Sequence, residues 1–514
     1  MTESNLKSNI GNLSNSIDLN MSSQSFGGFA RKVYLWMIGL YGCLVFNEFI
    51  KRPVDFLALA LILLGLPLIS RQNLSLLTQV VRHSKPTKLV FYSLFTLSLL
   101  FLSSTLNQLP QTEGLIAFGA QYGVHIGLAV VTLLVIPLNE QSIRFLNKAC
   151  LLALFLLALC DVLYFIEQAQ AHQILGTDYS HRWFGDGYVF LTPFLLARLL
   201  SFYQKGPQES LRAVRLCVLY LFLIMVMLLA GGTGARSTYG IITLELLTFF
   251  GIFLWQVILT PSKIPTANLA TSQTIKLSAL TIRKNWLRAA TYCVFLSILL
   301  VTIRLMLTAA IPQLFLSTLS RGTLIADRIQ HAWGPGIKMI TAKPILGHGF
   351  GHQAWDFALS SIQIAHPEIL NVGSPHNWFL AAGFLGGILA ILMQLVFAAA
   401  LVWGLIAYLR LPPKSFKFLA TSKSLALAVL ISFIAFYGLR GQVEFTIYKY
   451  LSLILIGFGL LQATLYSVSG AITDPKKPKN PKTQKPKNPK TPLVPTGRPL
   501  KKGGVSASGV FKDD

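Results

Sequence analysis

Long runs of apolar residues recur along this chain, and they constrain its fold more than any other feature of the sequence. Many of these runs reach or approach the ~20 residues that an α-helix needs to cross the hydrocarbon core of a bilayer. The composition agrees, because 53% of the 514 residues are hydrophobic and 12% are charged, whereas soluble domains carry about 25% charged residues. Since helices satisfy their own backbone hydrogen bonds in lipid, the sequence predicts an all-α, polytopic membrane protein.

Lysine and arginine set the expected orientation, because loops on the cytoplasmic side of a membrane carry more of them. Arg31 and Lys32 precede the first predicted helix, and taking that side as cytoplasmic places both termini inside. The basic residues that then fall in inside loops are Arg71, Arg82, Lys85, Lys88, Lys205, Arg212, Arg215, Lys263, Lys276, Arg283, Lys284, Arg288, Arg410, Lys414, Lys417 and Lys423. Lys51 and Arg52 are the clearest exception.

The apolar runs predict about twelve membrane-spanning helices. They cover residues 33–50, 55–69, 88–106, 115–137, 143–167, 188–203, 212–230, 237–259, 287–311, 376–408, 423–439 and 445–466. The chain then divides into a disordered cytoplasmic N-terminus (1–30), the first nine helices (31–311), a long external loop with short helices (312–375), the last three helices (376–468) and a disordered basic cytoplasmic tail (469–514). Residues 1–30 lack the cleavage pattern of a signal peptide, so the first helix is expected to remain as an anchor.

The formal net charge of +25 would also fit a nucleic-acid-binding protein. The excess lies, however, in short loops and in residues 471–514, which hold 11 lysines and arginines against 3 acidic residues. That tail repeats "KPKNPKT" at 477–483 and 485–491, and its prolines and like charges predict disorder. Basic segments next to a membrane attract anionic lipid, so we expect membrane lipids as partners and no nucleic acid.

Cysteine and histidine spacing predicts neither a disulfide nor a metal site. The five cysteines all fall in apolar runs, at Cys43, Cys150, Cys160, Cys217 and Cys293. His348 and His352 have the i, i+4 spacing of two ligands on a helix, but they form no HExxH pattern and the glycines between them disfavour a helix. We therefore expect no metal ion in this protein.

Arginines on the external face need an explanation, because the orientation rule predicts few basic residues there. They are Arg182, Arg236, Arg321, Arg328 and Arg440. Arg236, in "GARSTYG" at the start of the eighth predicted helix, is the most informative, since a cation is unfavourable at a helix N-terminus. A bound phosphate would compensate and would suit the planar guanidinium. The alternative is an arginine that extends to the lipid headgroups.

The string "SPHNWFLAAGFLGG" places His376 and Asn377 at the mouth of the tenth predicted helix. An imidazole there can act as a general base at an aqueous surface, or it can be an interfacial hydrogen-bonding residue, and both interpretations stay open. In the preceding loop, "RIQHAW" and "GIKMI" predict a short amphipathic helix that is broken at Gly334–Pro335. "KPILGHGFG" predicts a turn whose glycines let the backbone approach a ligand closely.

The order of these motifs resembles the O-antigen ligase/polymerase superfamily of bacterial envelopes. "RIQHAW", "PILGHGFG" and "PHNWFL" carry the specific match, which covers about residues 320–395. "GARSTYG" and "HRWFG" resemble two further arginine motifs of the family, at the eighth and before the sixth predicted helix. Members of the family often carry an acidic residue shortly after the His-Asn pair, and "AAGFLGG" has none.

The resemblance implies a glycosyltransferase of the bacterial inner membrane, with the long external loop in the periplasm. The donor would be a glycan on undecaprenyl pyrophosphate, and the acceptor would be a sugar hydroxyl of the lipid A-core. Arg236 and Arg328 would bind the pyrophosphate, while His376 would remove the acceptor proton or position the acceptor. Asn377 would orient the acceptor or cap the helix. The expected substrate-binding residues are Arg182, Arg321, Asn377, Trp333, Gly347 and Gly349. Arginines can neutralise the phosphates, so no metal or other cofactor is expected.

Other functions remain as alternatives. An O-antigen polymerase matches less well, because one external loop is long and no external arginine has a glycine eleven residues later. A protein O-oligosaccharyltransferase of the same superfamily would use the same donor. A secondary transporter also fits twelve helices with both ends inside, but such transporters have two related halves, and no internal repeat is visible in this sequence.

Overall fold

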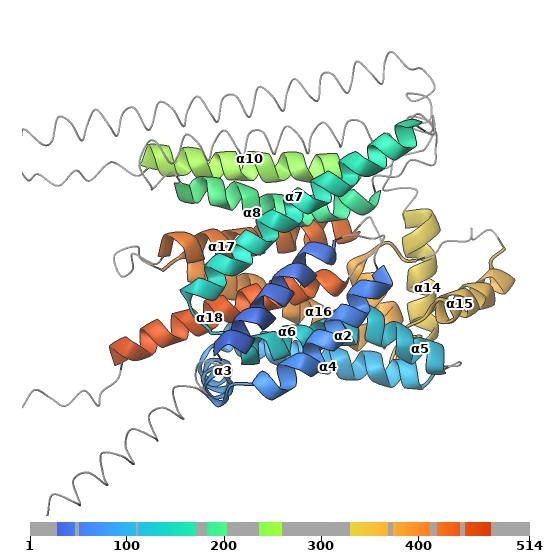
Figure 1. Ribbon diagram of the computed structural model, residues 1–514. Coiled ribbons are helices and arrows are strands. Elements are labelled where there is room, and N and C mark those ends of the chain that lie inside the picture. The colour runs from blue at the N-terminus through green and yellow to red at the C-terminus, as the bar shows by residue number, and fades with distance from the viewer. Residues whose placement is uncertain are drawn as a thin grey trace, which may run out of the picture. The chain divides into compact units, whose positions relative to one another are not determined.

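The chain is mostly helical in the parts that the computed structural model describes (Figure 1). These parts are residues 28–46, 51–108, 111–170, 182–202, 236–259, 329–367, 374–411, 419–442 and 448–473, and no strand occurs in them. The chain separates into two units, Met1–Ser467 and Val468–Asp514. The second unit is described only up to residue 473, and the helices that surround the candidate site all belong to the first unit.

The first helix covers residues 28–44. In chain order the elements after it are α2 (Lys51–Gly65), η2 (Leu66–Leu68), α3 (Arg71–His83), α4 (Lys85–Leu106), α5 (Gln111–Phe118), η3 (Gly119–Gly123), α6 (Val124–Val135), α7 (Glu140–Gln170), α8 (Arg182–Phe202), α10 (Arg236–Leu259), η5 (Ile329–Trp333), α14 (Gly334–Ala342), α15 (His352–Ala365), α16 (Trp378–Leu409), α17 (Leu419–Phe433), η7 (Ile434–Leu439), η8 (Arg440–Gln442), η9 (Tyr448–Tyr450) and α18 (Leu451–Thr473). The η elements are short 3₁₀ or π segments.

Six helices in the described parts are long and apolar enough to cross a membrane, and a bent pair of helices is a seventh candidate. The six are Lys85–Leu106, Gln111–Val135, Glu140–Asp161, Trp378–Leu409, Ser422–Gln442 and Tyr448–Tyr466, and the bent pair is Pro53–Leu68 with Arg71–His83. The first, sixth and eighth predicted spans are also helical, in residues 28–44, α8 and α10. The predicted spans 212–230 and 287–311 lie outside the described residues, so the total of twelve stays a prediction.

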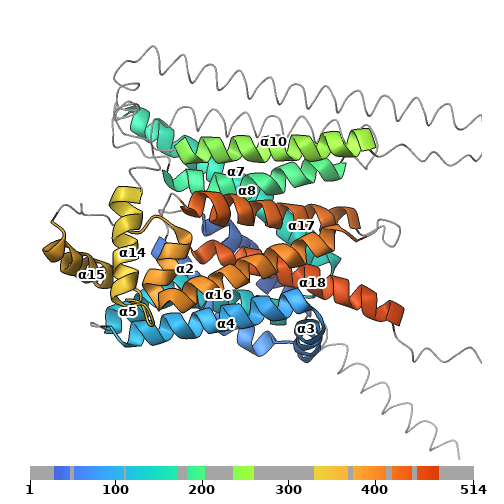
Figure 2. The same ribbon diagram turned by 180° about the vertical axis from the view of Figure 1, so that it is seen from behind.

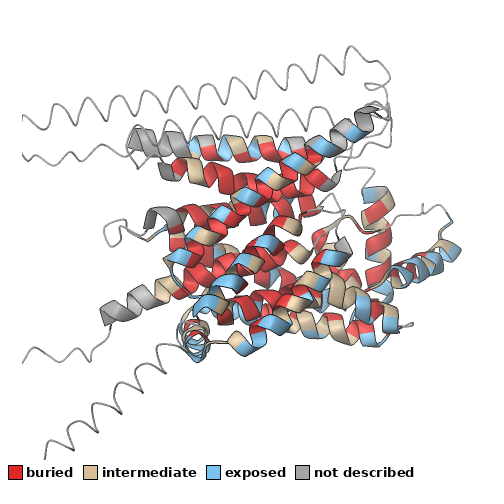
Figure 3. Ribbon diagram, viewed as in Figure 1, coloured by how far each residue is buried: buried red, intermediate tan, exposed pale blue. Residues whose placement is uncertain are grey.

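The helices of the first unit pack side by side and turn apolar faces outward. α4 lies along α16, α2 lies along α6, and α8 contacts α7, α10 and α17, as Figures 1 and 2 show from opposite sides. Buried residues line the inner faces of the helices and exposed residues their outer faces (Figure 3). Many of the exposed side chains are large and apolar, among them Phe91, Phe95 and Leu99 on α4 and Leu392 on α16. An apolar outer surface of this extent indicates that lipid surrounds the helices.

The predicted basic loop between the second and third spans is mostly a helix, α3. It begins after a break at residues 69–70, and it is bent by 104° from α2. The hydroxyl of Ser70 caps its first turn by accepting a hydrogen bond from Asn73 N at 3.4 Å. The loop prediction rested on basic residues alone, and it overlooked the apolar residues that recur along one side of this helix.

The tenth predicted span, 376–408, is not one straight helix. α16 is interrupted at Gly386 and Gly387, whose φ/ψ angles are −144°/17° and 77°/−173°. Gln394 Nε2 donates to Trp378 O at 2.8 Å although the two residues are 16 positions apart, a separation of about 24 Å in a straight helix. The chain therefore reverses at the two glycines. Residues 378–385, named here the half-helix, pack back along the start of the longer helix 388–409.

The glycine-rich loop 343–351 fits into this reversal. Pro344 O accepts from Ile388 N at 2.8 Å, and Phe384 O accepts from His348 N at 2.6 Å. Gly347 has a φ of 68°, and a Cβ atom there would lie 2.6 Å from Phe384 O. Gly347 thus allows backbone to pack on backbone, which is a different use from the predicted approach to a ligand.

The predicted break at Gly334–Pro335 is wrong. η5 continues directly into α14, since Trp333 between them has helical backbone angles (φ −75°, ψ −42°) and η5 is a π-helical turn that precedes Pro335. A Cβ atom on Gly336 would lie 3.1 Å from Pro375 Cβ. α14 therefore packs against the segment that immediately precedes His376.

Candidate functional site

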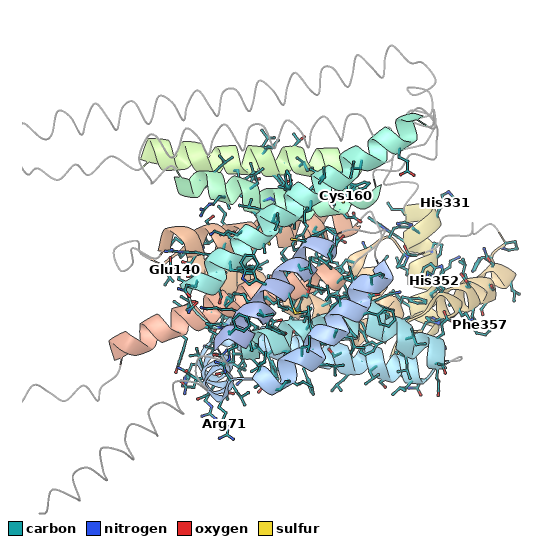
Figure 4. All side chains as sticks on the ribbon, in the orientation of Figure 1. Arg71, Glu140, Cys160, His331, His352 and Phe357 are labelled. Atoms are coloured by element: carbon teal, nitrogen blue, oxygen red, sulfur yellow. The ribbon has the colours of Figure 1, made fainter. Side chains whose placement is uncertain are left out.

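An open cavity of about 640 Å³ lies where the glycine-rich loop meets the half-helix. Its lining residues are Gln121, Gly349, Phe350, Gly351, His352, Trp355, Ser374, Pro375, His376, Asn377, Ala381, Phe384, Leu385 and Tyr448. Figure 4 shows His331 and His352 at this end of the helices and Arg71 and Glu140 at the other end. The cavity brings together Gly349, His376 and Asn377, three of the residues that the sequence predicts for the site.

Asn377 is the N-cap of the half-helix. Its Oδ1 accepts hydrogen bonds from Phe379 N and Leu380 N, both at 3.0 Å. Its Nδ2 donates to Gln442 Oε1 at 2.9 Å, which ties the half-helix to η8. Because the half-helix is folded back, Asn377 satisfies two of its N-terminal N–H groups within the protein. The sequence predicts that Asn377 orients the acceptor or caps the helix; the cap is confirmed, and substrate binding stays a prediction.

His376 has a backbone conformation that is unusual for its residue type. Its φ is 47°, and in the described parts of the chain it is the sole non-glycine residue with a positive φ. Its backbone N–H donates to Ser374 Oγ at 3.4 Å, and its side chain lines the cavity. A positive φ is uncommon at non-glycine residues, although histidine adopts it more often than most, so contacts around His376 hold it in this conformation.

Side chains from α4 and α5 hold the opposite wall of the cavity. Glu113 Oε1 accepts from His352 N at 3.1 Å and from Gln353 N at 3.3 Å, so it caps the start of α15. Gln108 Nε2 donates to Phe350 O, and Phe350 N donates to Thr105 Oγ1 at 3.3 Å. These hydrogen bonds hold the end of the glycine-rich loop 343–351, which the sequence predicts to approach a ligand.

His348 stabilises this wall and does not line the cavity. Its Nε2 lies 2.9 Å from Met339 O, so this nitrogen carries the proton, and its ring stacks on Phe384 with the ring centroids 4.9 Å apart. Burial lowers the pKa of His348; the hydrogen bond to Met339 O opposes that shift, and the charge of Lys343 adds to it. The structure therefore favours a neutral imidazole with a packing function at this position.

Arg440 links η8 to the starts of two other helices. It is 4% exposed, its Nε donates to Asp186 Oδ1, and its Nη1 donates to Thr238 Oγ1 at 2.6 Å. Asp186 lies in the first turns of α8 and Thr238 in the first turn of α10. A Cβ atom on Gly185 would lie 2.5 Å from Thr238 Oγ1, so these two helices start in direct contact.

The predicted arginines divide into two groups. Arg182 and Arg236 are the first residues of α8 and α10, so the structure brings their backbones to the cluster around Arg440. Their side chains are not described, and Arg321 and Arg328 lie outside the described residues. Arg440 is absent from the predicted site, although its place among the external arginines of the sequence was a signal for it.

Trp333 ends η5 beside the segment that leads to His376. Its Nε1 is buried and has no hydrogen-bond partner among the described residues. An indole N–H in a buried place normally finds a partner, so a ligand oxygen would satisfy this group. The predicted substrate-binding function of Trp333 stays a prediction.

A polar cluster behind the cavity is not predicted by the sequence analysis. Asp55 Oδ1 accepts from Lys449 Nζ and lies 3.1 Å from His125 Nε2, which is also 3.0 Å from Ala120 O. Because both neighbours of Nε2 are acceptors, Nε2 carries the proton and Nδ1 accepts from Tyr41 OH at 2.7 Å. Charged residues inside apolar spans are costly and usually functional, and that signal could have found Asp55 and Lys449.

This cluster positions two of the cavity walls. Ala120 precedes Gln121 in η3, and Lys449 follows Tyr448 in η9, and both Gln121 and Tyr448 line the cavity. Among the described residues, no group of three or more His, Cys, Asp or Glu side chains could hold a metal ion. The polar residues on the cavity lining are Gln121, His352, Ser374, His376, Asn377 and Tyr448, which supply imidazole, amide and hydroxyl groups.

No protein-family model matches this chain, and no curated protein matches it either. The resemblance to the O-antigen ligase/polymerase superfamily thus rests on the sequence motifs alone.

Proposed function

We propose that this protein is an O-antigen ligase-like glycosyltransferase of the bacterial inner membrane, with both termini in the cytoplasm and its active face in the periplasm. It transfers a glycan from undecaprenyl pyrophosphate to a sugar hydroxyl of the lipid A-core. The cavity beside His376 takes the acceptor sugar. The arginines at the starts of α8 and α10, together with Arg328, take the pyrophosphate.

The convergence of three distant motifs carries this proposal. "HRWFG", "GARSTYG" and "PHNWFL" lie far apart in the sequence, yet the helices that begin in them meet at one end of the first unit. The bonds from Asn377 to Gln442 and from Arg440 to Asp186 and Thr238 make the connection. A purely structural arrangement would not need arginines at two helix N-termini, where the dipole opposes them.

The reaction is a displacement at the anomeric carbon of the donor. The acceptor hydroxyl oxygen forms a bond to that carbon, the bond from the carbon to the pyrophosphate oxygen breaks, and the hydroxyl proton passes to His376. Negative charge then grows on the leaving pyrophosphate. Preorganised cations and N–H groups aimed at that charge lower the barrier by about 3–4 kcal/mol for each good donor. Asn377 holds the half-helix, and thereby His376, in place.

The lipopolysaccharide profile of a strain that lacks this protein tests the proposal. We expect polymer to accumulate on the lipid carrier and to be missing from the lipid A-core. Complementation with Arg236→Ala or His376→Ala should leave transfer at least about 100-fold below wild type, while the protein still inserts. Arg144→Ala is the matched control, because Arg144 is exposed and pairs with Glu140 at the other end of the helices.

The same profile separates the alternatives. A lipid A-core that carries a single repeat unit would identify a polymerase. An unchanged profile would contradict the proposal and direct attention to protein glycosylation or transport. Normal polymer on the lipid A-core in either site variant would contradict the assignment of Arg236 or His376.

A further inference from the structure

α3 lies across the end of α6 in a fixed orientation. It is bent by 104° from α2. The amide of Asn73 donates to the carbonyl oxygens of Leu133 (3.3 Å), Leu134 (3.2 Å) and Ile136 (2.7 Å) at the C-terminal end of α6. The last carbonyl groups of a helix have no partner within that helix. The Asn73 amide binds such carbonyl groups, and these bonds hold α3 against the end of α6. If α2 crosses the membrane, α3 runs close to the membrane plane.

The two sides of α3 differ in polarity. The apolar side carries Val80, which is buried, and beside it Leu77 and Val81, which are half-buried, and Leu74, which is 50% exposed. Leu74, Leu77 and Val81 follow one another at i, i+3 and i+7, so they form a stripe that the protein only partly covers. The opposite side carries polar residues only. This is the pattern of a helix that lies at the boundary between headgroups and acyl chains.

The polar side of α3 and the start of α4 are strongly basic. Arg71, Arg82, Lys85 and Lys88 are all exposed, and residues 56–112 contain no Asp or Glu. None of the four forms an ion pair with a described carboxylate. Arginine in such a place binds phosphate oxygens with two parallel hydrogen bonds, and lysine adds a point charge.

We propose that α3 is an interfacial helix that binds anionic phospholipid headgroups through Arg71, Arg82, Lys85 and Lys88, while Leu74, Leu77 and Val81 enter the acyl region beneath them. The ligand class is a phospholipid with a net negative headgroup, and zwitterionic lipid does not replace it. This proposal is independent of the proposed enzymatic function, because α3 lies at the end of α4 away from the cavity.

Native mass spectrometry of the full-length protein tests this proposal. The protein is released from nanodiscs that contain equal amounts of phosphatidylglycerol and phosphatidylcholine, and the retained lipids are identified. We expect wild type to retain phosphatidylglycerol preferentially. The variant with Arg71, Arg82, Lys85 and Lys88 all changed to Gln should lose that preference by about tenfold or more, since each surface cation contributes to the attraction.

Two further variants make the outcome decisive. Arg71→Gln/Arg82→Gln changes only exposed residues of α3 and should lose part of the preference, so the proposal remains testable if the fourfold variant does not fold. Lys338→Gln/Lys343→Gln, on and after α14, removes two cations at the other end of the helices and should keep the preference of wild type. An undiminished preference in both α3 variants, or an equal loss in the Lys338/Lys343 variant, would overturn the proposal.

Discussion

At the scale of single residues, Asn377 combines two structural functions that its sequence context indicates only in part. Its side-chain oxygen caps the half-helix, and its side-chain nitrogen holds Gln442, two residues from Arg440. A motif shows that a polar residue lies at a helix start. It does not show that this start is folded back among other helices, because that depends on a reversal ten residues later.

Substitutions at Asn377 separate the two functions. Asn377→Asp keeps the oxygen that caps the half-helix but cannot donate to Gln442, whereas Asn377→Ala loses both bonds. Loss of an N-cap costs about 1 kcal/mol, so we expect the thermal unfolding midpoint of the detergent-solubilised protein to fall in the order wild type, Asp variant, Ala variant. Identical midpoints for all three proteins would show that the cap contributes nothing.

His348 predicts a dependence of stability on pH. Burial lowers its pKa in the folded protein below the value of about 6.5 in the unfolded chain, so the unfolded chain takes up the proton first as pH falls. The stabilising contribution of the neutral ring is therefore complete above about pH 6.5 and declines as pH falls below that value.

Denaturation curves between pH 5 and 8 measure this effect. We expect His348→Gln, which can still donate to Met339 O, to have a flatter pH dependence of unfolding free energy than wild type. The same change at half-buried His331 serves as the control. An identical slope for wild type and His348→Gln would contradict the assignment.

At the scale of elements, the apolar runs predicted most described helices, and the exceptions have physical causes. Runs of about 20 apolar residues leave the backbone no alternative to a helix in lipid, so α4, α7 and α18 follow from the sequence. The reversal in α16 could not be predicted, because two adjacent glycines serve helix packing as well as a sharp bend. The direction of the reversal depends on loop 343–351, which forms hydrogen bonds with Phe384 before the two glycines and with Ile388 after them.

Gly387 provides the test of this reversal. Its φ is 77°, and an added Cβ atom would lie 2.5 Å from Pro344 O and also meet Ile345 O. We expect Gly387→Ala to destabilise the protein by at least about 2 kcal/mol. Gly240→Ala on α10 is the matched control, since an added Cβ atom there has no neighbour within 4 Å. Equal stability of the two variants in thermal unfolding would contradict the described reversal.

Part of the candidate site could also be predicted from the sequence. His376, Asn377 and Gly349 carry distinctive motifs, and the structure places all three on one cavity. Glu113 and Gln108 support that cavity through contacts between residues distant in sequence, and such contacts leave no local pattern. The sequence indicated which residue types do chemistry, but the supporting residues depend on tertiary packing.

At the scale of the whole molecule, the basic residues of α3 and of the start of α4 are separated from the cavity by the length of α4. Lys85 begins this helix next to α3, and Thr105 near its other end contacts Phe350 at the cavity. A helix of 22 residues is about 33 Å long, which matches the thickness of a bilayer core. The predicted orientation, with basic loops inside and the site outside, requires this separation.

The C-terminal tail should not contribute to the reaction. Residues 468–514 form a separate unit from residues 1–467, which contain the cavity. We expect deletion of residues 475–514 to leave polymer transfer within about twofold of wild type, measured on lipopolysaccharide gels at matched protein abundance. Loss of transfer at normal abundance would show that the tail has a function in catalysis or assembly.

The central claim is that His376 and the arginines at the starts of α8 and α10 transfer a glycan from a polyprenyl pyrophosphate. Transfer by the purified protein in nanodiscs, supplied with a lipid-pyrophosphate-linked glycan and lipid A-core, measures this most directly. We expect wild type and Arg144→Ala to transfer glycan to the lipid A-core and to release undecaprenyl pyrophosphate. We expect neither product from His376→Ala or Arg236→Ala. Equal product from all four proteins, or none from a folded wild type with both substrates present, would contradict it.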